Sequence, residues 1–261
     1  MRFAARYVKR LHCVKGAEAD AKAPRPHLEL RRGEMNIPFA NRREAGQLLA
    51  EKLQAYGRRA DVLVLALPRG GVPIAFEVAK VLRAPLDVFV VRKLGVPGDE
   101  ELAMGAIASG GVRVLNEEVT SRIELTNSDI DDITSREQKE LERREGLYRA
   151  GRPAVQVQGR AIILVDDGLA TGSTMRAAAT ALRKMNPLKI VIAVPVAAAD
   201  TCREFRGEVD EVICVVTPEP FMAVGAWYAD FSQTSDEEVR ELLQRAASCG
   251  QAGSSSFCPG S

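Results

Sequence analysis

The sequence predicts an α/β domain: a mainly parallel, twisted sheet with helices on both of its faces. Two observations support this prediction. Short apolar runs, typical of strands that are buried on both faces, alternate with helical patterns from residue 61 to residue 216. Several of these runs end directly in loops that carry charged residues and glycines. In parallel sheets of this kind, ligands bind beyond the carboxyl ends of the strands.

The composition is that of a globular protein, with 261 residues of which 46% are hydrophobic and 27% are charged. The net charge is +1, so no overall field attracts nucleic acid or an anionic membrane, and we expect neither as a partner. No apolar run approaches the ~20 residues of a membrane span, and the amino-terminal residues lack the apolar core of a secretory signal. We therefore expect a cytoplasmic protein.

The domain boundaries are predicted from the loss of periodicity at both ends. Residues 1–34 have no sustained pattern, and we expect a disordered extension there. Residues 35–243 form the predicted domain, and the serine- and glycine-rich residues 244–261 form a predicted disordered tail.

Cysteine and histidine usage limits the chemistry. The five cysteines are odd in number and lack CxxC spacing, which indicates neither a disulfide framework nor a zinc site. We expect Cys202 and Cys214 to pack in the core as small hydrophobes. The only histidines, His12 and His27, lie in the predicted extension. The domain therefore has no Ser-His-Asp triad, no Cys-His dyad and no histidine-rich metal centre.

The first predicted helix begins after Asn41, with Glu44 as a capping-box acid, and ends before Gly57. Its Arg42-Arg43 pair sits near acids and is interpreted as part of a solvated face.

The strand predicted over 61–67 leads into a loop, Pro68-Arg-Gly-Gly-Val-Pro73, and then into a helix over 74–82. Its glycines, Gly70 and Gly71, permit a close backbone approach to an anion, and Arg69 can contact two phosphoryl oxygens at once. Taken alone, a plain tight turn with an exposed arginine explains this loop equally well.

The next strand, predicted over 86–91, ends in Arg92 and Lys93. A glycine-rich segment without clear periodicity follows over 94–111, and a short strand is expected over 112–115. Residues 117–148 are predicted to be mainly helical, with a charge-dense, solvated face.

The most informative segment begins with a buried strand over 161–165 that ends in two acids, Asp166 and Asp167. A loop with glycines and hydroxyls follows, and a helix begins near Thr174. Amides and hydroxyls at a helix start attract phosphate. The carboxylates would repel phosphate, so they are better suited to sugar hydroxyls or to Mg²⁺. The spacing excludes a Walker P-loop, because three residues separate Gly168 from Gly172 and no lysine follows. A strand-to-helix turn with solvated aspartates is the plainer alternative.

The segment Ile162-Ile-Leu-Val-Asp-Asp-Gly-Leu-Ala-Thr-Gly-Ser-Thr174 resembles the 5-phosphoribosyl-1-pyrophosphate (PRPP) signature of type I phosphoribosyltransferases. The resemblance implies that Asp166 and Asp167 are the catalytic acids, which hold the ribose hydroxyls and could ligate Mg²⁺. The residues it implies for the 5-phosphate are Gly168, Ala170, Thr171, Gly172, Ser173 and Thr174.

The resemblance extends to two earlier segments. The loop with Arg69, Gly70 and Gly71 resembles the pyrophosphate loop of the family, and Arg92 and Lys93 are further candidates for pyrophosphate contact. Segment 94–111 resembles the mobile hood that closes over PRPP and excludes water.

The remaining strands are predicted over 189–196 and 211–216, with a helix over 199–205 between them. A last short helix is predicted over 235–243. Phe221 and Val224 loosely resemble base-binding positions of the family, although the spacing departs from that pattern. Packing against the last strand explains the aromatic residues of this segment equally well.

The order of these motifs looks like that of uncharacterised bacterial phosphoribosyltransferase-domain proteins. It implies transfer of the phosphoribosyl group from PRPP to a nitrogenous base or similar nitrogen acceptor, with Mg²⁺ and release of pyrophosphate, in nucleotide metabolism such as salvage. Family members often pair, so a homodimer is an expectation. The alternative is a PRPP-binding regulator without catalysis, which usually needs a nucleic-acid-binding surface.

Overall fold

A computed structural model of the chain describes residues 39–122 and 126–251. The extension predicted over 1–34 and the last part of the predicted tail, 252–261, lie outside the described residues.

A five-stranded parallel sheet forms the centre of the domain, in the order β2-β1-β6-β7-β8. Its register aligns β1 with β6 from the pair Val62–Ala161 to the pair Ala66–Val165, so the two strands end side by side. All residues of these two strands are buried, which confirms the predicted parallel sheet. The strands are β1 (Val62–Ala66), β2 (Leu86–Val88), β6 (Ala161–Val165), β7 (Lys189–Val196) and β8 (Glu211–Val216).

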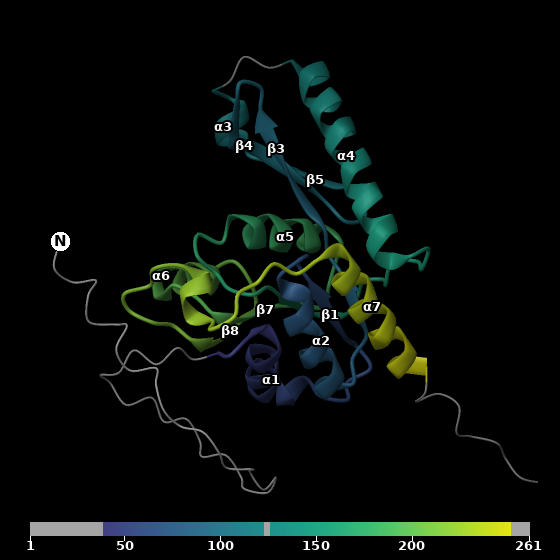
Figure 1. The fold of residues 1–261 in the computed structure, drawn as a ribbon. Helices are drawn as coiled ribbons and strands as arrows, with labels where there is room; N and C mark the ends of the chain where they lie inside the picture. The colour runs from purple at the N-terminus through teal and green to yellow at the C-terminus, as the bar shows by residue number, and fades with distance from the viewer. Residues whose placement is uncertain (1–38, 123–125, 252–261) are drawn as a thin grey trace, which may run out of the picture. The chain divides into compact units, whose positions relative to one another are not determined.

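Helices cover both faces of this sheet (Figure 1). The core divides accordingly, because successive side chains of a strand point to opposite faces. Val62 and Val64 pack with α1 (Arg42–Lys52), α2 (Gly71–Leu82) and α7 (Asp236–Gln251). Leu63 and Leu65 pack with α5 (Ser173–Lys184) and α6 (Ala199–Phe205) on the other face.

A second, antiparallel sheet rises from the main sheet over α5 and forms the hood (Figure 1). It consists of β3 (Val91–Val96), β4 (Asp99–Ala108) and β5 (Val112–Leu115), followed by α3 (Glu117–Thr120) and α4 (Asn127–Arg149). Two predictions are corrected here. The strand predicted over 86–91 is divided between the two sheets, and most of segment 94–111, expected as a loop, is strand. The apolar run hides the division because Phe89 and Val90 are buried where the chain crosses.

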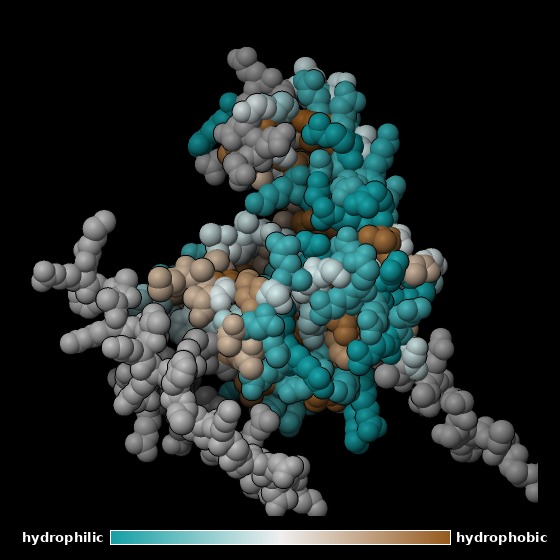
Figure 2. Space-filling view, in the orientation of Figure 1, coloured by the Kyte–Doolittle hydropathy of each residue, from teal (hydrophilic) through white to brown (hydrophobic). Residues whose placement is uncertain are grey.

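Helix α4 confirms the predicted charged helix. Thr126 and Asp129 form a capping box at its start, in which each side chain bonds the backbone N–H of the other residue. Ile130, Ile133 and Leu141 are buried in the core. The visible face of α4 is covered by hydrophilic residues (Figure 2).

The two ends of the described domain differ in how closely they match the sequence. Asn41 caps α1 as predicted, with its Oδ1 accepting from the Glu44 amide at 3.0 Å; α1 is followed by a short 3₁₀ turn, η1 (Gln54–Tyr56). Helix α7 continues to Gln251, past the end predicted at residue 243. The extra turns arise because Ala246 still packs on the core. No helix in the described parts of the chain is long and apolar enough to cross a bilayer.

Candidate active site

The acid pair directly follows the carboxyl end of β6, the central strand of the parallel sheet. Both side chains are partly buried, and each has one carboxylate oxygen in contact with the protein. Oδ1 of Asp166 accepts the backbone N–H of Asp167 at 2.8 Å. The hydroxyl of Tyr228 donates to the backbone carbonyl of Asp167 at 2.6 Å and so holds the backbone of the pair.

The surroundings of the acid pair raise the pKa values of Asp166 and of the neighbouring Tyr228. Burial raises the pKa of Asp166 well above its usual range, and the neighbouring charge of Asp167 raises it further. The Asp167 amide and the guanidinium of Arg42 oppose this rise in the pKa. Burial, followed by the charge of Asp167, also raises the pKa of Tyr228, so its hydroxyl stays protonated at neutral pH and remains a donor.

The loop after β1 lies directly against the acid pair. The amide of Leu67 donates to the carbonyl of Val165 at 2.9 Å, so the loop begins beside the end of β6. A Cβ atom built on Gly70 would lie 2.7 Å from Cγ of Asp167 and closer still to its Oδ2. One built on Gly71 would lie 2.7 Å from the carbonyl oxygen of Val165. Both glycines are therefore required by close approach, and the predicted pyrophosphate loop and the acids are brought together.

Arg69 projects from this loop toward the start of α7. Its Nη1 lies 3.8 Å from Oδ1 of Asp236, and the guanidinium is about half exposed. The same carboxylate oxygen accepts the hydroxyl of Tyr148 at 2.8 Å. Arg69 is thus at the predicted edge of the sheet, with a long and weak ion pair that an anionic ligand could replace.

The loop after the acids connects β6 to α5 and is anchored on its β7 side. The amide of Leu169 donates to the carbonyl of Val196 at 2.9 Å, and the amide of Ala198 donates back to Leu169 at 3.0 Å. Gly172 has φ of +71°, and a Cβ atom there would lie 2.5 Å from the Phe205 ring. Glycine is needed for both reasons.

The predicted phosphate-binding groups are open to solvent. Thr171, Ser173 and Thr174 are exposed, and their hydroxyls make no hydrogen bond within the described residues. The first backbone N–H groups of α5 have no partner inside the helix. Hydroxyls, amides and the positive end of the helix dipole together make a suitable anion site.

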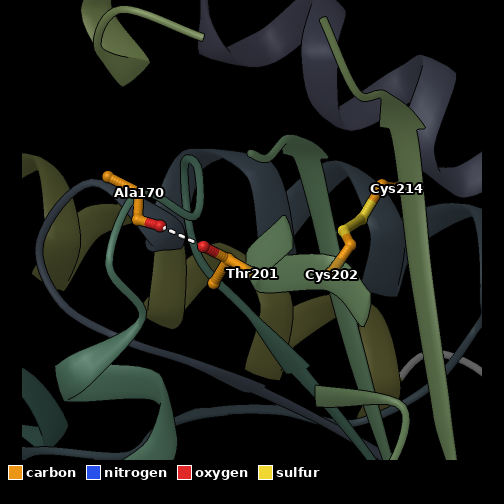
Figure 3. The surroundings of a disulfide bond; sticks show 4 residues. All are labelled: Ala170, Thr201, Cys202 and Cys214. Atoms are coloured by element: carbon orange, nitrogen blue, oxygen red, sulfur yellow. Dashed lines mark hydrogen bonds between the residues drawn. A yellow bond between two sulfur atoms is a disulfide. The ribbon is translucent and has the colours of Figure 1, made fainter. Parts of the chain in front are cut away.

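Helix α6 holds the loop between β6 and α5 through a hydrogen bond to its backbone. The hydroxyl of Thr201 donates to the carbonyl of Ala170 at 2.6 Å (Figure 3). The next residue, Cys202, is bonded to Cys214 of β8 through a disulfide (Figure 3). Cys202 is buried, as predicted, but the disulfide corrects the expectation that these cysteines pack only as small hydrophobes. The sequence could not reveal the pair, because their proximity depends on how α6 packs on β8.

Arg92 and Lys93 lie in β3 of the hood, not at the end of a strand of the main sheet. The Nε and Nη2 atoms of Arg92 donate to Oε2 of Glu137 on α4 at 3.0 and 2.7 Å. Both basic residues line a cavity of about 550 Å³ between β3 and α4. The structure thus does not bring Arg92 to the acid pair, and the pyrophosphate contacts of both residues remain predictions.

The segment after β8 supplies the other wall of the site. A Cβ atom built on Gly168 would lie 2.8 Å from Cγ2 of Val224, so Val224 packs directly on the loop after the acids. Phe221 packs on a small cluster that includes Phe39 and Tyr228. Val224 is therefore next to the predicted phosphate loop, whereas the described contacts of Phe221 are those of a packing residue.

The sequence did not identify Arg42 as a site residue. Its guanidinium donates to Oδ2 of Asp167 and is largely buried, whereas the adjacent Arg43 is 71% exposed and pairs with Glu77. Successive helix residues point about 100° apart, so only one member of such a pair can face the site. The pattern of acidic and basic residues in the sequence does not show which of the two arginines faces the site.

The donor set is compatible with Mg²⁺ carried by a substrate. Among the described residues, no group of three or more His, Cys, Asp or Glu side chains could hold a metal ion. Oδ2 of Asp166 and Oδ1 of Asp167 accept no hydrogen bond within the described chain. Mg²⁺ accepts one or two carboxylates and takes its other ligands from phosphates and water.

Comparison with known proteins shows the family of the chain. Residues 40–225 match the model of the phosphoribosyl transferase domain family. A Mycobacterium tuberculosis protein named "Putative phosphoribosyl transferase" is 49% identical over 208 residues, which is 80% of this chain and 47% of that protein. The chain thus spans about half the length of the curated relatives it matches. The crystal structure of TT1426 from Thermus thermophilus is 42% identical, with a TM-score of 0.71, over 79% of this chain and 98% of that one.

Proposed function

The chain belongs to the phosphoribosyl transferase domain family, and we propose that it transfers the 5-phosphoribosyl group from PRPP to a nitrogenous base or a similar nitrogen acceptor. One observation carries this proposal: two loops suited to anions meet on either side of the acid pair. Gly70 and Gly71 close in from the β1 side. Exposed hydroxyls and the start of α5 follow on the β6 side. A sugar with a phosphate at each end matches this order of groups.

In the proposed reaction, the bond between C1 of the ribose and the pyrophosphate oxygen breaks, and pyrophosphate leaves with the electron pair. A lone pair on the acceptor nitrogen forms the new bond to C1, and the proton of that nitrogen passes to solvent. Positive charge develops on the ribose in the transition state, where Asp166 and Asp167 can stabilise it. Arg69 and the amide of Gly70 stabilise negative charge on the leaving pyrophosphate, whereas the amide of Gly71 donates to the carbonyl of Leu67 at 3.1 Å.

Mg²⁺, when bound, would neutralise part of the charge of the pyrophosphate, and Asp166 and Asp167 are the residues suited to hold it. The chain's own groups orient the sugar between the two loops. Such positioning contributes to rate because the reacting atoms need not be brought together from solution.

The proposed activity is tested by incubating the full chain with PRPP, Mg²⁺ and single acceptors, and measuring released pyrophosphate. The acceptor panel contains purines, pyrimidines, orotate and related nitrogen compounds. We expect one class of acceptor to give multiple turnovers, and the Asp166→Asn/Asp167→Asn double variant to turn over more slowly by on the order of 10²-fold or more. Tight PRPP binding without release for every acceptor would contradict catalysis and favour a PRPP-binding regulator.

A further inference from the structure

Arg42, the first residue of α1, is held by contacts on three sides. Its Nε and Nη2 atoms donate to Oδ2 of Asp167 at 3.0 and 2.8 Å, and Nη1 donates to the carbonyl of Ser232 at 2.6 Å. The guanidinium lies 4.0 Å from the centroid of the Phe231 ring. Only 12% of the side chain is exposed. The planar guanidinium donates hydrogen bonds in two directions and also stacks on an aromatic ring. The ammonium group of a lysine could not make this set of contacts.

The backbone that carries Arg42 is fixed by backbone contacts with residues 228–230, of which Tyr228 also bonds the carbonyl of Asp167. Phe39 bridges to Tyr228, and the amides of Ala229 and Asp230 donate to the carbonyls of Phe39 and Ala40 at 2.9 and 3.0 Å. These bonds join the start of α1 to the segment that provides Phe231 and Ser232. Arg42 therefore approaches Asp167 from a rigid support.

In each of the two carboxylates, the protein contacts one oxygen atom and leaves the other without a hydrogen bond in the described chain. Oδ2 of Asp167 is enclosed by Arg42 and by the backbone of Gly70. Oδ1 of Asp166 is taken by the Asp167 amide. Within the described chain, the remaining oxygen of each acid accepts no hydrogen bond. Each carboxylate thus has one oxygen bound to the protein and one available to a ligand.

We propose that Arg42 is a positioning residue, which holds Oδ2 of Asp167 so that Oδ1 is presented to a hydroxyl of the bound sugar. The inference rests on the proposed function, because the sugar is the ribose of PRPP. A carboxylate that is already fixed loses less conformational freedom when it accepts a hydroxyl, so the ligand binds more tightly. Arg42 acts through Asp167 and does not touch the reacting atoms.

The inference predicts that Arg42 affects only ligands that contain the sugar. We would measure the dissociation constants of Mg²⁺–PRPP and of pyrophosphate without Mg²⁺ by calorimetry for the wild type and Arg42→Gln, because pyrophosphate without the metal ion has no reason to contact Asp167. Loss of one charge-assisted contact predicts PRPP binding weaker by roughly tenfold or more, with pyrophosphate binding unchanged within about twofold. Arg43→Gln is the matched control, because Arg43 is its exposed neighbour, and should bind both ligands as the wild type does.

A double-mutant cycle separates positioning from general support of the fold. If Arg42 acts through Asp167, Arg42→Gln should weaken PRPP binding by less than about twofold in an Asp167→Asn background. Equal weakening for both ligands in Arg42→Gln, or additive losses in the cycle, would overturn the inference. A wild-type chain that binds neither ligand would instead refute the proposed function. Unfolding curves of each variant show which of them remain folded.

Discussion

At the scale of single residues, the acid pair is the centre of the account. Asp166 and Asp167 are adjacent, but the burial of Asp166 and the ion pair of Asp167 with Arg42 give them different surroundings. Such a pair can offer to one sugar two carboxyl groups that differ in their surroundings, one of which is anchored by an arginine. The roles of these residues can therefore be tested by removing charge without changing size.

Replacing both acids by asparagine should lower the turnover number by on the order of 10²-fold or more, because stabilisation of the positively charged transition state is lost. Steady-state pyrophosphate release is the measurement, and Glu241→Gln on the exposed face of α7 is the control. A double variant with wild-type turnover would show that the acids have no catalytic role.

Gly70→Ala should abolish PRPP binding or weaken it strongly, because the added methyl group would displace the Asp167 carboxylate. Gly146→Ala is the control, since nothing lies within 4 Å of a Cβ atom at that position in α4. That substitution should stabilise the helix by about 0.5–1 kcal/mol. Calorimetry and urea unfolding of both variants check the prediction, which fails if Gly70→Ala binds PRPP normally.

The sequence predicted the acids and both loops as site residues from motif spacing, and the structure places them directly after the ends of β1 and β6. The sequence did not identify Arg42, Thr201 or Tyr228, because each reaches the site from an element distant in the chain. A side chain's orientation toward another element depends on tertiary packing, which neither charge pattern nor residue type reveals.

At the scale of the elements, β7 and β8 are joined at one end by a polar cluster. Lys189 at the start of β7 donates to Glu211 at 2.6 Å and to the hydroxyl of Tyr56 at 2.7 Å. The hydrogen bond from Lys189, followed by that from Tyr56, lowers the pKa of Glu211. A carboxylate with a lowered pKa in the folded state stabilises the fold above its unfolded pKa, and this contribution is lost as the pH falls.

Glu211→Gln should therefore be less stable than the wild type near pH 7, and the difference should shrink below about pH 4.5, where the glutamate of the unfolded chain is protonated. The cluster is partly exposed, so we expect a loss below about 1 kcal/mol. Urea unfolding across this pH range checks the prediction. A constant difference at every pH would show that the lowered pKa of Glu211 does not contribute to stability.

Strands β7 and β8 and helix α6 were predicted at their observed bounds, because long apolar runs and short charged gaps mark them clearly. The hood was less predictable. Its first strand continues the apolar run of β2, and its glycines, such as Gly105 at the centre of β4, are typical of loops as well as of bent strands. The position of the hood in the chain could be predicted from the sequence, but the antiparallel sheet that it forms could not.

At the scale of the whole molecule, the two sheets serve different purposes. The parallel sheet fixes the acid pair and the loops that follow β1 and β6 on a buried framework. The hood carries Arg92 and Lys93 over α5, with Arg92 tied to α4 by Glu137. A ligand bound to this framework should stabilise the fold as a whole, because it binds the folded chain and not the unfolded one.

Mg²⁺–PRPP at a concentration of 100 times its dissociation constant should raise the free energy of unfolding by about 2.7 kcal/mol. Thermal unfolding with and without the ligand is the measurement. Ribose without phosphates is the control and should give no shift, because it lacks both anions. An equal shift with ribose would indicate that the two anion loops do not bind the ligand.

The most direct test of the account is a calorimetric titration of the intact chain with Mg²⁺–PRPP. The geometry of the acid pair and its two loops predicts a saturable heat with one ligand bound per chain, which the Asp166→Asn/Asp167→Asn variant loses or weakens strongly. A wild-type chain that gives no heat of binding, in a folded state confirmed by its unfolding curve, would contradict the central claim.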